Sequence, residues 1–198
     1  MTTISRRALL GSAMVAGWGA QAAPGAEPRW KIGVTDWNLK MGANPDAVPL
    51  AARIGFEGVQ VSFGRRLVND RMPADDPEIS ARYLRLSQEC KIPINSTCVD
   101  RLHDNGLKND RLAVKWVLDA IRLTHALSAS VLLLPFFGRC EIKTREEMDA
   151  VGDALREVAP EAEKAGVLLA LEDTVSAEDN ARIMDRSRWM ASHSAPFG

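Results

Sequence analysis

Residues 144–172 read TREEMDAVGDALREVAPEAEKAGVLLALE. Thr144 and Glu147 stand three residues apart, which is the spacing of a capping box, so a long helix is expected to begin there. Gly166 is the kind of residue that ends a helix in the left-handed conformation. The apolar run 167–171 that follows indicates a strand buried on both faces. This stretch therefore predicts one helix–strand unit of an α/β protein.

The same alternation runs through the chain from Lys31 onward, and it predicts five strands and five helices. Strands are expected at 31–35, 59–62, 92–97, 131–134 and 167–171, and helices from Asn44-Pro45, from Asp76-Pro77 to about Glu89, from Asp110 to about Leu127, from Thr144 and from Ser176. The third helix should bury Leu112, Trp116, Ala120 and Leu123 along one face. Alternating strands and helices predict a parallel sheet with right-handed crossovers.

Two architectures accept this pattern: a closed barrel of (β/α) units and an open doubly wound sheet. The turn after the first strand, residues 35–38, reads TDWN and lacks the glycines that let a pyrophosphate approach a dinucleotide fold. The sequence also contains no GxxxxGK[ST] loop. A nucleotide site is therefore not expected, while both architectures stay open.

The composition is that of a folded globular protein, because 46% of the 198 residues are hydrophobic and 26% are charged. The net charge is −1 without a long run of one sign, so no nucleic-acid partner and no anionic membrane surface are expected. Three cysteines, Cys90, Cys98 and Cys140, have spacings unlike a metal knuckle and are interpreted as buried small hydrophobic residues.

Residues 1–22 have the order of an export signal. Arg6 and Arg7 precede the weakly apolar run 8–20, and Ala20-Gln21-Ala22 offers a cleavage site. The apolar run is shorter than the roughly 20 residues that span a bilayer. Paired arginines predict a twin-arginine type of signal, cleavage after Ala22, a periplasmic location and no membrane attachment afterwards. The alternative is that this segment is an N-terminal helix of the mature domain.

Polar and aromatic side chains follow each predicted strand, where parallel α/β folds gather their catalytic residues. They are Asp36 and Trp37, Ser62 and Arg65, Asp100, His103 and Asp104, Phe136, Phe137 and Glu141, and Glu172 and Asp173. Glu172 ends an apolar strand abruptly, which suits an oxygen ligand of a divalent cation on a rigid element; it could equally be a solvated strand end.

The other candidates each have a structural alternative. Trp37, Phe136 and Phe137 could stack on a sugar ring or close the top of the core. His103 could be a general base or a surface residue. Arg65-Arg66 could hold an anionic substrate or be a solvated pair.

Four segments, 32–38, 54–62, 132–138 and 171–178, resemble the xylose isomerase-like family of sugar phosphate isomerases and epimerases, above all its exported members. The resemblance covers residues 30–186. It implies a TIM barrel that binds a divalent metal, often Mn²⁺, Mg²⁺ or Zn²⁺, and moves protons on sugar carbons next to a carbonyl. It also implies that Glu172 is a metal-binding catalytic glutamate and that Glu178 contacts a sugar or polyol substrate. Trp37, His103 and Phe136 are then the further substrate-binding candidates.

The sequence departs from the family at its end, because residues 187–198 show no strand pattern and no resemblance. The family's remaining metal ligands lie on strands six to eight, for which no pattern is found here. The expectation is an incomplete barrel of about five βα units. It could be an isomerase or epimerase impaired by that loss or completed by self-association, or it could be a non-catalytic remnant or sugar-binding module.

Overall fold

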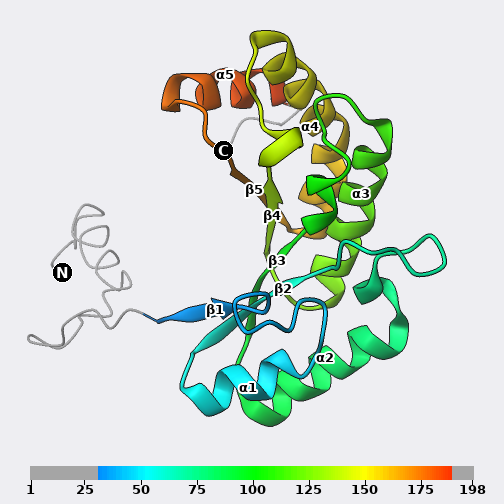
Figure 1. Ribbon diagram of the computed structural model, residues 1–198, viewed down its shortest axis with the longest axis vertical. Coiled ribbons are helices and arrows are strands. Elements are labelled where there is room, and N and C mark those ends of the chain that lie inside the picture. The colour runs from blue at the N-terminus through cyan, green and yellow to red at the C-terminus, as the bar shows by residue number, and fades with distance from the viewer. Residues whose placement is uncertain (1–30, 189–198) are drawn as a thin grey trace, which may run out of the picture. The chain divides into compact units, whose positions relative to one another are not determined.

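A computed structural model describes residues 31–188, in which five strands alternate with five α-helices as predicted (Figure 1). The predicted signal at 1–22 and most of the predicted tail at 187–198 lie outside these residues. The elements are β1 Gly33–Thr35, α1 Ala47–Ile54, β2 Gly58–Ser62, η2 Pro73–Asp75, α2 Pro77–Cys90, β3 Ile94–Cys98, η3 Asp100–His103, α3 Arg111–Ala126, β4 Val131–Pro135, η4 Gly138–Cys140, α4 Arg145–Ala165, β5 Leu168–Glu172 and α5 Ala177–Ser187, where η marks a short 3₁₀ helix.

All four strand pairings are parallel, and the spatial order is β1-β2-β3-β4-β5. A doubly wound sheet would reverse direction at a switch point, whereas here each new strand is added on the same side of the one before it. Figure 1 shows the helices along one side of the sheet. The described residues therefore form part of a (β/α) barrel, with β1 and β5 at the two edges of the sheet.

The hydrophobic core lies between the sheet and the helices. Val59 and Val61 of β2 and Leu132 and Leu134 of β4 are completely buried, and they alternate with residues that face the other side of the sheet. From the helix layer, α1 packs against β2, and α3 packs against β3 and β4. In α3 the predicted face is right for Trp116, Ala120 and Leu123, which are buried.

The prediction is wrong for Leu112, whose side chain is 52% exposed. The buried stripe of α3 is centred on Ala113, Val117, Ala120 and Thr124. Leu112 therefore lies one helical step, about 100°, away from the centre of the stripe at its first turn.

The predicted burial of β5 on both faces is also wrong. Leu168 is 66% exposed, and no residue of this strand is fully buried. β5 is an edge strand, and within residues 31–188 no layer packs on the sheet face opposite the helices. An apolar strand needs such a layer on each side before both faces can be buried.

Helix ends follow the predicted caps in most places. Thr144 and Glu147 form both hydrogen bonds of a capping box, and Asp76 and Ser176 cap α2 and α5 through their side chains. The exception is α1, which begins at Ala47 and not at the predicted Asn44-Pro45. The Asn44 Oδ1 atom instead accepts the N–H of Asp46 at 3.0 Å, which makes a turn before the helix.

A β-bulge interrupts the pairing of β2 with β3, because Val59 pairs with Ile94 and the next residue, Gln60, pairs with Ser96. Asn95 is thus an extra residue on β3. A Cβ atom added at Gly33 would lie 2.6 Å from the Asn95 Nδ2 atom, and one added at Gly58 would lie 3.1 Å from it. The amide of Asn95 therefore lies over two neighbouring strands at glycine positions, where a side chain would have to displace it.

Within the described part of the chain, no helix combines the length and the apolar character that crossing a bilayer requires.

Candidate active site

A pocket of about 310 Å³ opens at the carboxyl ends of the strands. Every strand contributes to it, because parallel strands bring their carboxyl ends to one edge of the sheet. Its lining residues are Trp37 after β1, Ser62 and Arg65 at and after β2, Cys98, Asp100 and His103 at and after β3, Pro135 and Phe137 at and after β4, and Glu172 at the end of β5.

Three of the predicted site residues, Trp37, His103 and Glu172, meet in this pocket. Trp37 is 40% exposed, and Glu172 is exposed as well, so both side chains are accessible to a small molecule. The interpretation of Glu172 as a residue near the ends of the first four strands agrees with this placement.

Phe136 is not among the lining residues, since it is 1% exposed and belongs to the core. Its N–H donates to the Glu172 carbonyl at 2.9 Å, which continues the pairing of β4 with β5 by one residue. Side chains of successive extended residues point to opposite faces, so Phe137 reaches the pocket in its place. The Phe137 ring stacks near the His103 ring with a centroid distance of 6.3 Å and an interplanar angle of 25°.

Glu178 also lies outside this pocket. It is in the first turn of α5, where it lines a separate surface hollow together with Asp149 of α4 and Arg182 of α5. The backbone at the helix N-terminus and the Ser176 hydroxyl lower the pKa of the Glu178 carboxyl. The structure therefore gives Glu178 a place at the helix start and does not bring it to Glu172.

Asp36 is fully buried beneath the pocket and fastens the loop after β1. Its Oδ2 atom accepts three hydrogen bonds, from the Ser62 N–H at 2.9 Å, the Ala43 N–H at 3.0 Å and the Ser62 hydroxyl at 3.1 Å. Burial nevertheless raises the pKa of Asp36 to about 6. Since Trp37 is the next residue, these bonds also fix where the indole enters the pocket.

Asp100 reaches the pocket from the start of η3, where its Oδ1 atom accepts the Gly64 N–H at 2.8 Å. Burial raises the pKa of this carboxyl to about 6. Burial also lowers the pKa of His103, which favours the neutral imidazole. The pocket thus contains a carboxyl group that can gain or lose a proton close to neutral pH, which is the property of a general acid or base.

Two predicted buried cysteines lie close by. Cys98 is 3% exposed and lines the pocket floor, and burial raises the pKa of its thiol. Cys140 is 4% exposed, and its thiol donates to the His103 carbonyl at 3.4 Å. Cys90 on α2 is half-buried, and all three thiols are free. The interpretation as buried hydrophobic residues is right for Cys98 and Cys140.

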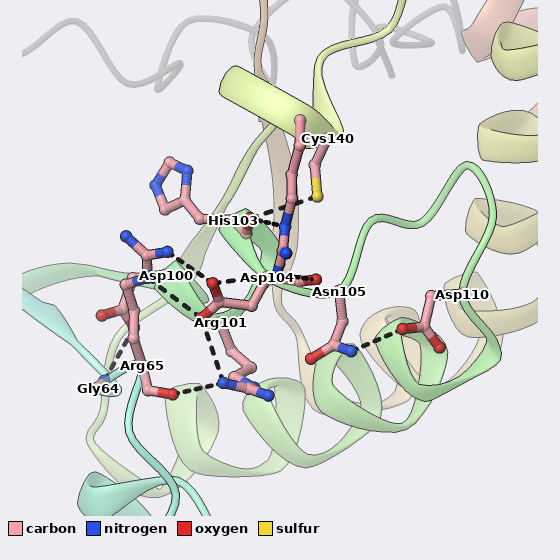
Figure 2. A network of polar contacts seen from close by, with 10 residues as sticks. Gly64, Arg65, Asp100, Arg101, His103, Asp104, Asn105, Asp110 and Cys140 are labelled. Atoms are coloured by element: carbon pink, nitrogen blue, oxygen red, sulfur yellow. Dashed lines mark hydrogen bonds and ion pairs between the residues drawn. The ribbon is translucent and has the colours of Figure 1, made fainter.

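A polar network surrounds Asp104 at the start of the loop after η3 (Figure 2). Arg65, Arg101 and Arg139 all donate to the Asp104 carboxylate, at 2.7, 3.2 and 3.3 Å for their shortest bonds. The hydrogen bond from Arg65 lowers the pKa of Asp104. Sequence reasoning did not find this network, because its members come from three different loops and follow no periodic pattern.

The described residues contain no group of three or more His, Cys, Asp and Glu side chains placed to hold a metal ion. A divalent cation of the kind implied by the resemblance takes several oxygen or nitrogen ligands, of which Glu172 would be one. Residues 31–188 by themselves therefore do not fit a complete metal centre.

The parallel sheet and its consecutive strand order define a protein of the (β/α)-barrel class, with a pocket at the carboxyl ends of its strands. The sequence model of the family described as xylose isomerase-like TIM barrel matches residues 48–190. The chain belongs to this family.

One curated relative is a 2-epi-5-epi-valiolone 7-phosphate 2-epimerase from an Actinoplanes species, 27% identical over 146 residues that cover 73% of this chain and 53% of that protein. The chain thus spans about half the length of the curated relative that it matches.

Among solved structures, D-allulose 3-epimerase from Methylomonas sp. in complex with D-allulose is similar with a TM-score of 0.55 and 18% identity, covering 80% of this chain and 59% of that one. A xylose isomerase-like TIM barrel protein from Mycobacterium smegmatis in complex with magnesium has a TM-score of 0.58 and 13% identity, covering 80% and 61%. At these identities the two structures share the fold with this chain.

Proposed function

We propose that the pocket binds a small sugar or polyol and serves an isomerase or epimerase, which moves a proton on a carbon next to a carbonyl. The observation that carries this proposal is the meeting of Asp100, His103 and Glu172 with two aromatic faces in one pocket of about 310 Å³. This volume is at the small end of ligand pockets, which suits a monosaccharide.

The aromatic side chains have a role in this proposal that follows from their placement. Trp37 follows β1, Phe137 follows β4, and both side chains line the pocket. Their flat apolar faces can pack against the C–H groups of a sugar, while carboxylates accept hydrogen bonds from its hydroxyls. Asp100, with its pKa raised to about 6 by burial, is the group we assign to proton transfer within the described residues.

We also propose that Glu172 is one ligand of a divalent cation, Mn²⁺, Mg²⁺ or Zn²⁺. A solved relative of the same fold contains magnesium, and Glu172 ends a strand at the pocket edge. The further ligands would have to come from outside residues 31–188, for instance from a second copy of the chain. Such a cation would polarise a carbonyl or alkoxide oxygen of the substrate.

A second candidate function is a sugar-binding module without turnover. The observation that favours it is that residues 31–188 do not bring together three side chains able to hold a metal. The two candidates share the pocket and differ in whether a complete catalytic centre forms around Glu172.

Two measurements on the full-length chain test both candidates. The first is calorimetric titration with Mn²⁺, and the second is incubation with D-fructose in deuterated water to detect exchange of its protons. As a monomer the chain should bind Mn²⁺ only weakly, through Glu172, so that Glu172→Gln abolishes the binding, and it should not exchange ketose protons; a self-associated chain whose second copy supplies the missing ligands should do both. Glu89→Gln, on the exposed face of α2, is the matched control. Tight stoichiometric Mn²⁺ binding that requires Glu172, together with proton exchange, would establish the enzyme and remove the module. If Trp37→Ala and Asp100→Asn both bind D-fructose as well as the parent chain does, the sugar site itself is refuted.

We further propose that the chain is exported to the periplasm through residues 1–22. The support is the order of paired arginines, apolar run and small residues in the sequence. Replacing Arg6 and Arg7 together by lysine should leave the precursor in the cytoplasm. A mature N-terminus after Ala22 in the periplasm of that double variant would overturn the proposal.

A further inference from the structure

We infer that the edge formed by β5 and α5 binds the edge formed by β1 and α1 of a second copy of this chain, so that copies associate head to tail. The two edges lie at opposite ends of the row of five strands (Figure 1). The inference goes beyond the proposed function. It rests on three matches between the edges, in their exposed apolar side chains, their backbone groups and their charges.

Exposed apolar side chains gather at these two edges. Ile32 before β1 is 64% exposed and Ile54 at the end of α1 is 56% exposed, while Leu168 of β5 is 66% and Met184 of α5 is 51% exposed. Four of the seven exposed large hydrophobic side chains among residues 31–188 thus belong to the first and the last βα unit. Apolar groups gathered in this way mark a surface that another protein covers.

The open side of β5 carries backbone groups that no strand within residues 31–188 pairs with. The Leu168 N–H donates to the Ser130 carbonyl at 2.8 Å, and the Glu172 carbonyl accepts the Phe136 N–H at 2.9 Å. The even-numbered residues of this strand therefore turn their backbone groups toward β4. The N–H and C=O groups that point to the open edge are those of Leu169 and Leu171.

The open side of β1 has the matching groups. The Ile32 carbonyl accepts the Glu57 N–H at 2.8 Å, and the Asp36 N–H donates to the Gln60 carbonyl at 3.0 Å. Even-numbered residues thus face β2, and the open edge is formed by Gly33 and Thr35. A parallel pair of β5 with the β1 of a second copy would continue the direction of every pair in the sheet.

A hollow of about 240 Å³ on the helix side of β5 fits a side chain that a second β1 would bring. Its apolar lining includes Leu155 of α4, Leu169 and Leu171 of β5 and Met184 of α5. Val34 lies on the helix side of β1 because it pairs with the buried Val59, and Ile32, two residues earlier, lies on the same side. A β1 strand placed beside β5 therefore directs its Ile32 toward this hollow.

Basic side chains dominate the surface of the β1 and α1 edge. Of the acidic residues there, Asp36 is fully buried and Asp46 pairs with Arg82 of α2. Glu57 is half-buried and accepts the Ile32 N–H at 3.4 Å. The exposed cations, none of which has an ion-pair partner among residues 31–188, are Lys31, Lys40 and Arg53.

Acidic side chains dominate the β5 and α5 edge, because its cations are already bound by carboxylates of α4 or α5. These bound cations are Lys164, Arg182, Arg186 and Arg188. The exposed acidic side chains without a cation among residues 31–188 are Glu163, Glu172 and Glu178.

The positions of these charges favour the parallel arrangement. Lys31 and Arg53 lie at the amino ends of the strands, as Glu163 does, whereas Lys40 lies at the carboxyl ends, as Glu172 does. A parallel contact of β5 with β1 therefore brings opposite charges together at both ends. An antiparallel contact between two β5 strands would instead bring Glu163 of one copy toward Glu172 of the other.

The contact has a consequence for the pocket. Parallel strands of two copies end on the same side, so the loop after β1 of the second copy, with its Trp37, comes next to Glu172. The second copy thus adds a wall to the pocket at the place where the sheet of one copy stops. Because each copy keeps one further edge, the contact repeats until a ring closes.

The test is sedimentation velocity of the full-length chain at micromolar concentrations, where the parent should associate. Ile32→Lys blocks the β1 edge and Met184→Lys blocks the β5 edge. Each should weaken association about tenfold or more, because the burial of an apolar side chain is lost. Leu112→Lys changes a similarly exposed residue of α3, away from both edges, and should leave association unchanged.

Mixing the two edge variants tests the head-to-tail arrangement. The Ile32→Lys chain keeps its β5 edge and the Met184→Lys chain keeps its β1 edge. An equimolar mixture should therefore form a heterodimer through one intact contact, although each variant alone stays monomeric. An interface between two β5 edges would leave the Ile32→Lys chain associated, which would overturn the inference.

The parent chain provides a measurement that does not depend on the folding of a variant. Carbodiimide treatment of mixed ¹⁴N- and ¹⁵N-labelled chains should give cross-links between copies that join Lys31 or Lys40 to Glu163 or Glu172. A parent that stays monomeric, cross-links confined to one copy, or a Leu112→Lys chain as weakly associated as the edge variants would each overturn the inference. These samples contain neither sugar nor metal, so their outcome is distinct from that of the tests of the proposed function.

Discussion

Replacing Asp36 by asparagine should flatten the dependence of folding stability on pH between about pH 4 and pH 6. Asp36 is fully buried, and burial raises its pKa from 3.8 to about 6 in the folded protein. Between these two values the folded state keeps a proton that the unfolded state has released. The free energy of unfolding of the parent chain therefore falls as the pH rises through this window.

The size of the effect follows from the shift. A difference of one pKa unit corresponds to about 1.4 kcal/mol, so a shift from 3.8 to about 6 corresponds to about 3 kcal/mol. This contribution is fully present below pH 3.8 and is lost by the time the pH exceeds about 6. Asparagine does not ionise, and its amide oxygen can still accept from the N–H groups of Ser62 and Ala43.

Urea unfolding of the two proteins, followed by tryptophan fluorescence at half-unit steps of pH, measures this difference. The Asp36→Asn chain should gain about 3 kcal/mol relative to the parent between pH 4 and pH 7. Asp70→Asn is the control, because Asp70 is exposed and has a left-handed backbone with φ of 57° that asparagine also tolerates. Parallel pH profiles for the Asp36→Asn chain and the parent would refute the reasoning.

Three further outcomes are expected. Thr144→Ala should lower the free energy of unfolding by about 1 kcal/mol, because it removes the bond that caps α4 at the Glu147 N–H; an unchanged urea midpoint would contradict this. The pKa of His103 measured by NMR should lie below the ordinary histidine value of 6.5, since burial favours the neutral ring, and a pKa at or above that value would argue against its placement in the pocket. The full chain should self-associate in sedimentation, and Leu168→Lys, on the exposed edge strand β5, should shift it toward monomer; a compact monomer of the parent chain would exclude this.

The elements could be predicted from the sequence where local chemistry decides them. Thr144 and Glu147 cap α4 by bonds between residues three apart, and Asp76 and Ser176 cap their helices over the same short range. Strand positions follow from apolar runs between such caps. The strand order could be narrowed to two architectures, and the choice between them required the pairing of β1 with β2 and of each later strand with the next.

Burial could not be predicted equally well, because it depends on what packs against an element. The residues of β5 are apolar in sequence, yet Leu168 is 66% exposed because β5 lies at the edge of the sheet. Leu112 has the right spacing for the buried face of α3 and lies just beside it. Neither fact is contained in the local pattern.

The site could be predicted in part. The rule that parallel strands end at one edge was sufficient to bring Trp37, His103 and Glu172 together. A shift of one residue in strand register would exchange Phe136 and Phe137 between the core and the pocket, and the sequence alone does not determine that register. Glu178 is displaced because its position depends on the direction in which α5 leaves the sheet, and the partners of Asp104 depend on loop conformation.

The bulge at Asn95 has a consequence for how this chain can change over generations. Asn95 lies over Gly33 and Gly58, and a methyl group at Gly33 would come within 2.6 Å of its amide nitrogen. A side chain gained at Gly33 or Gly58 therefore requires the exposed Asn95 amide to move aside or position 95 to become smaller. Replacements at these three sites are coupled in this way, although the sites lie on three different strands.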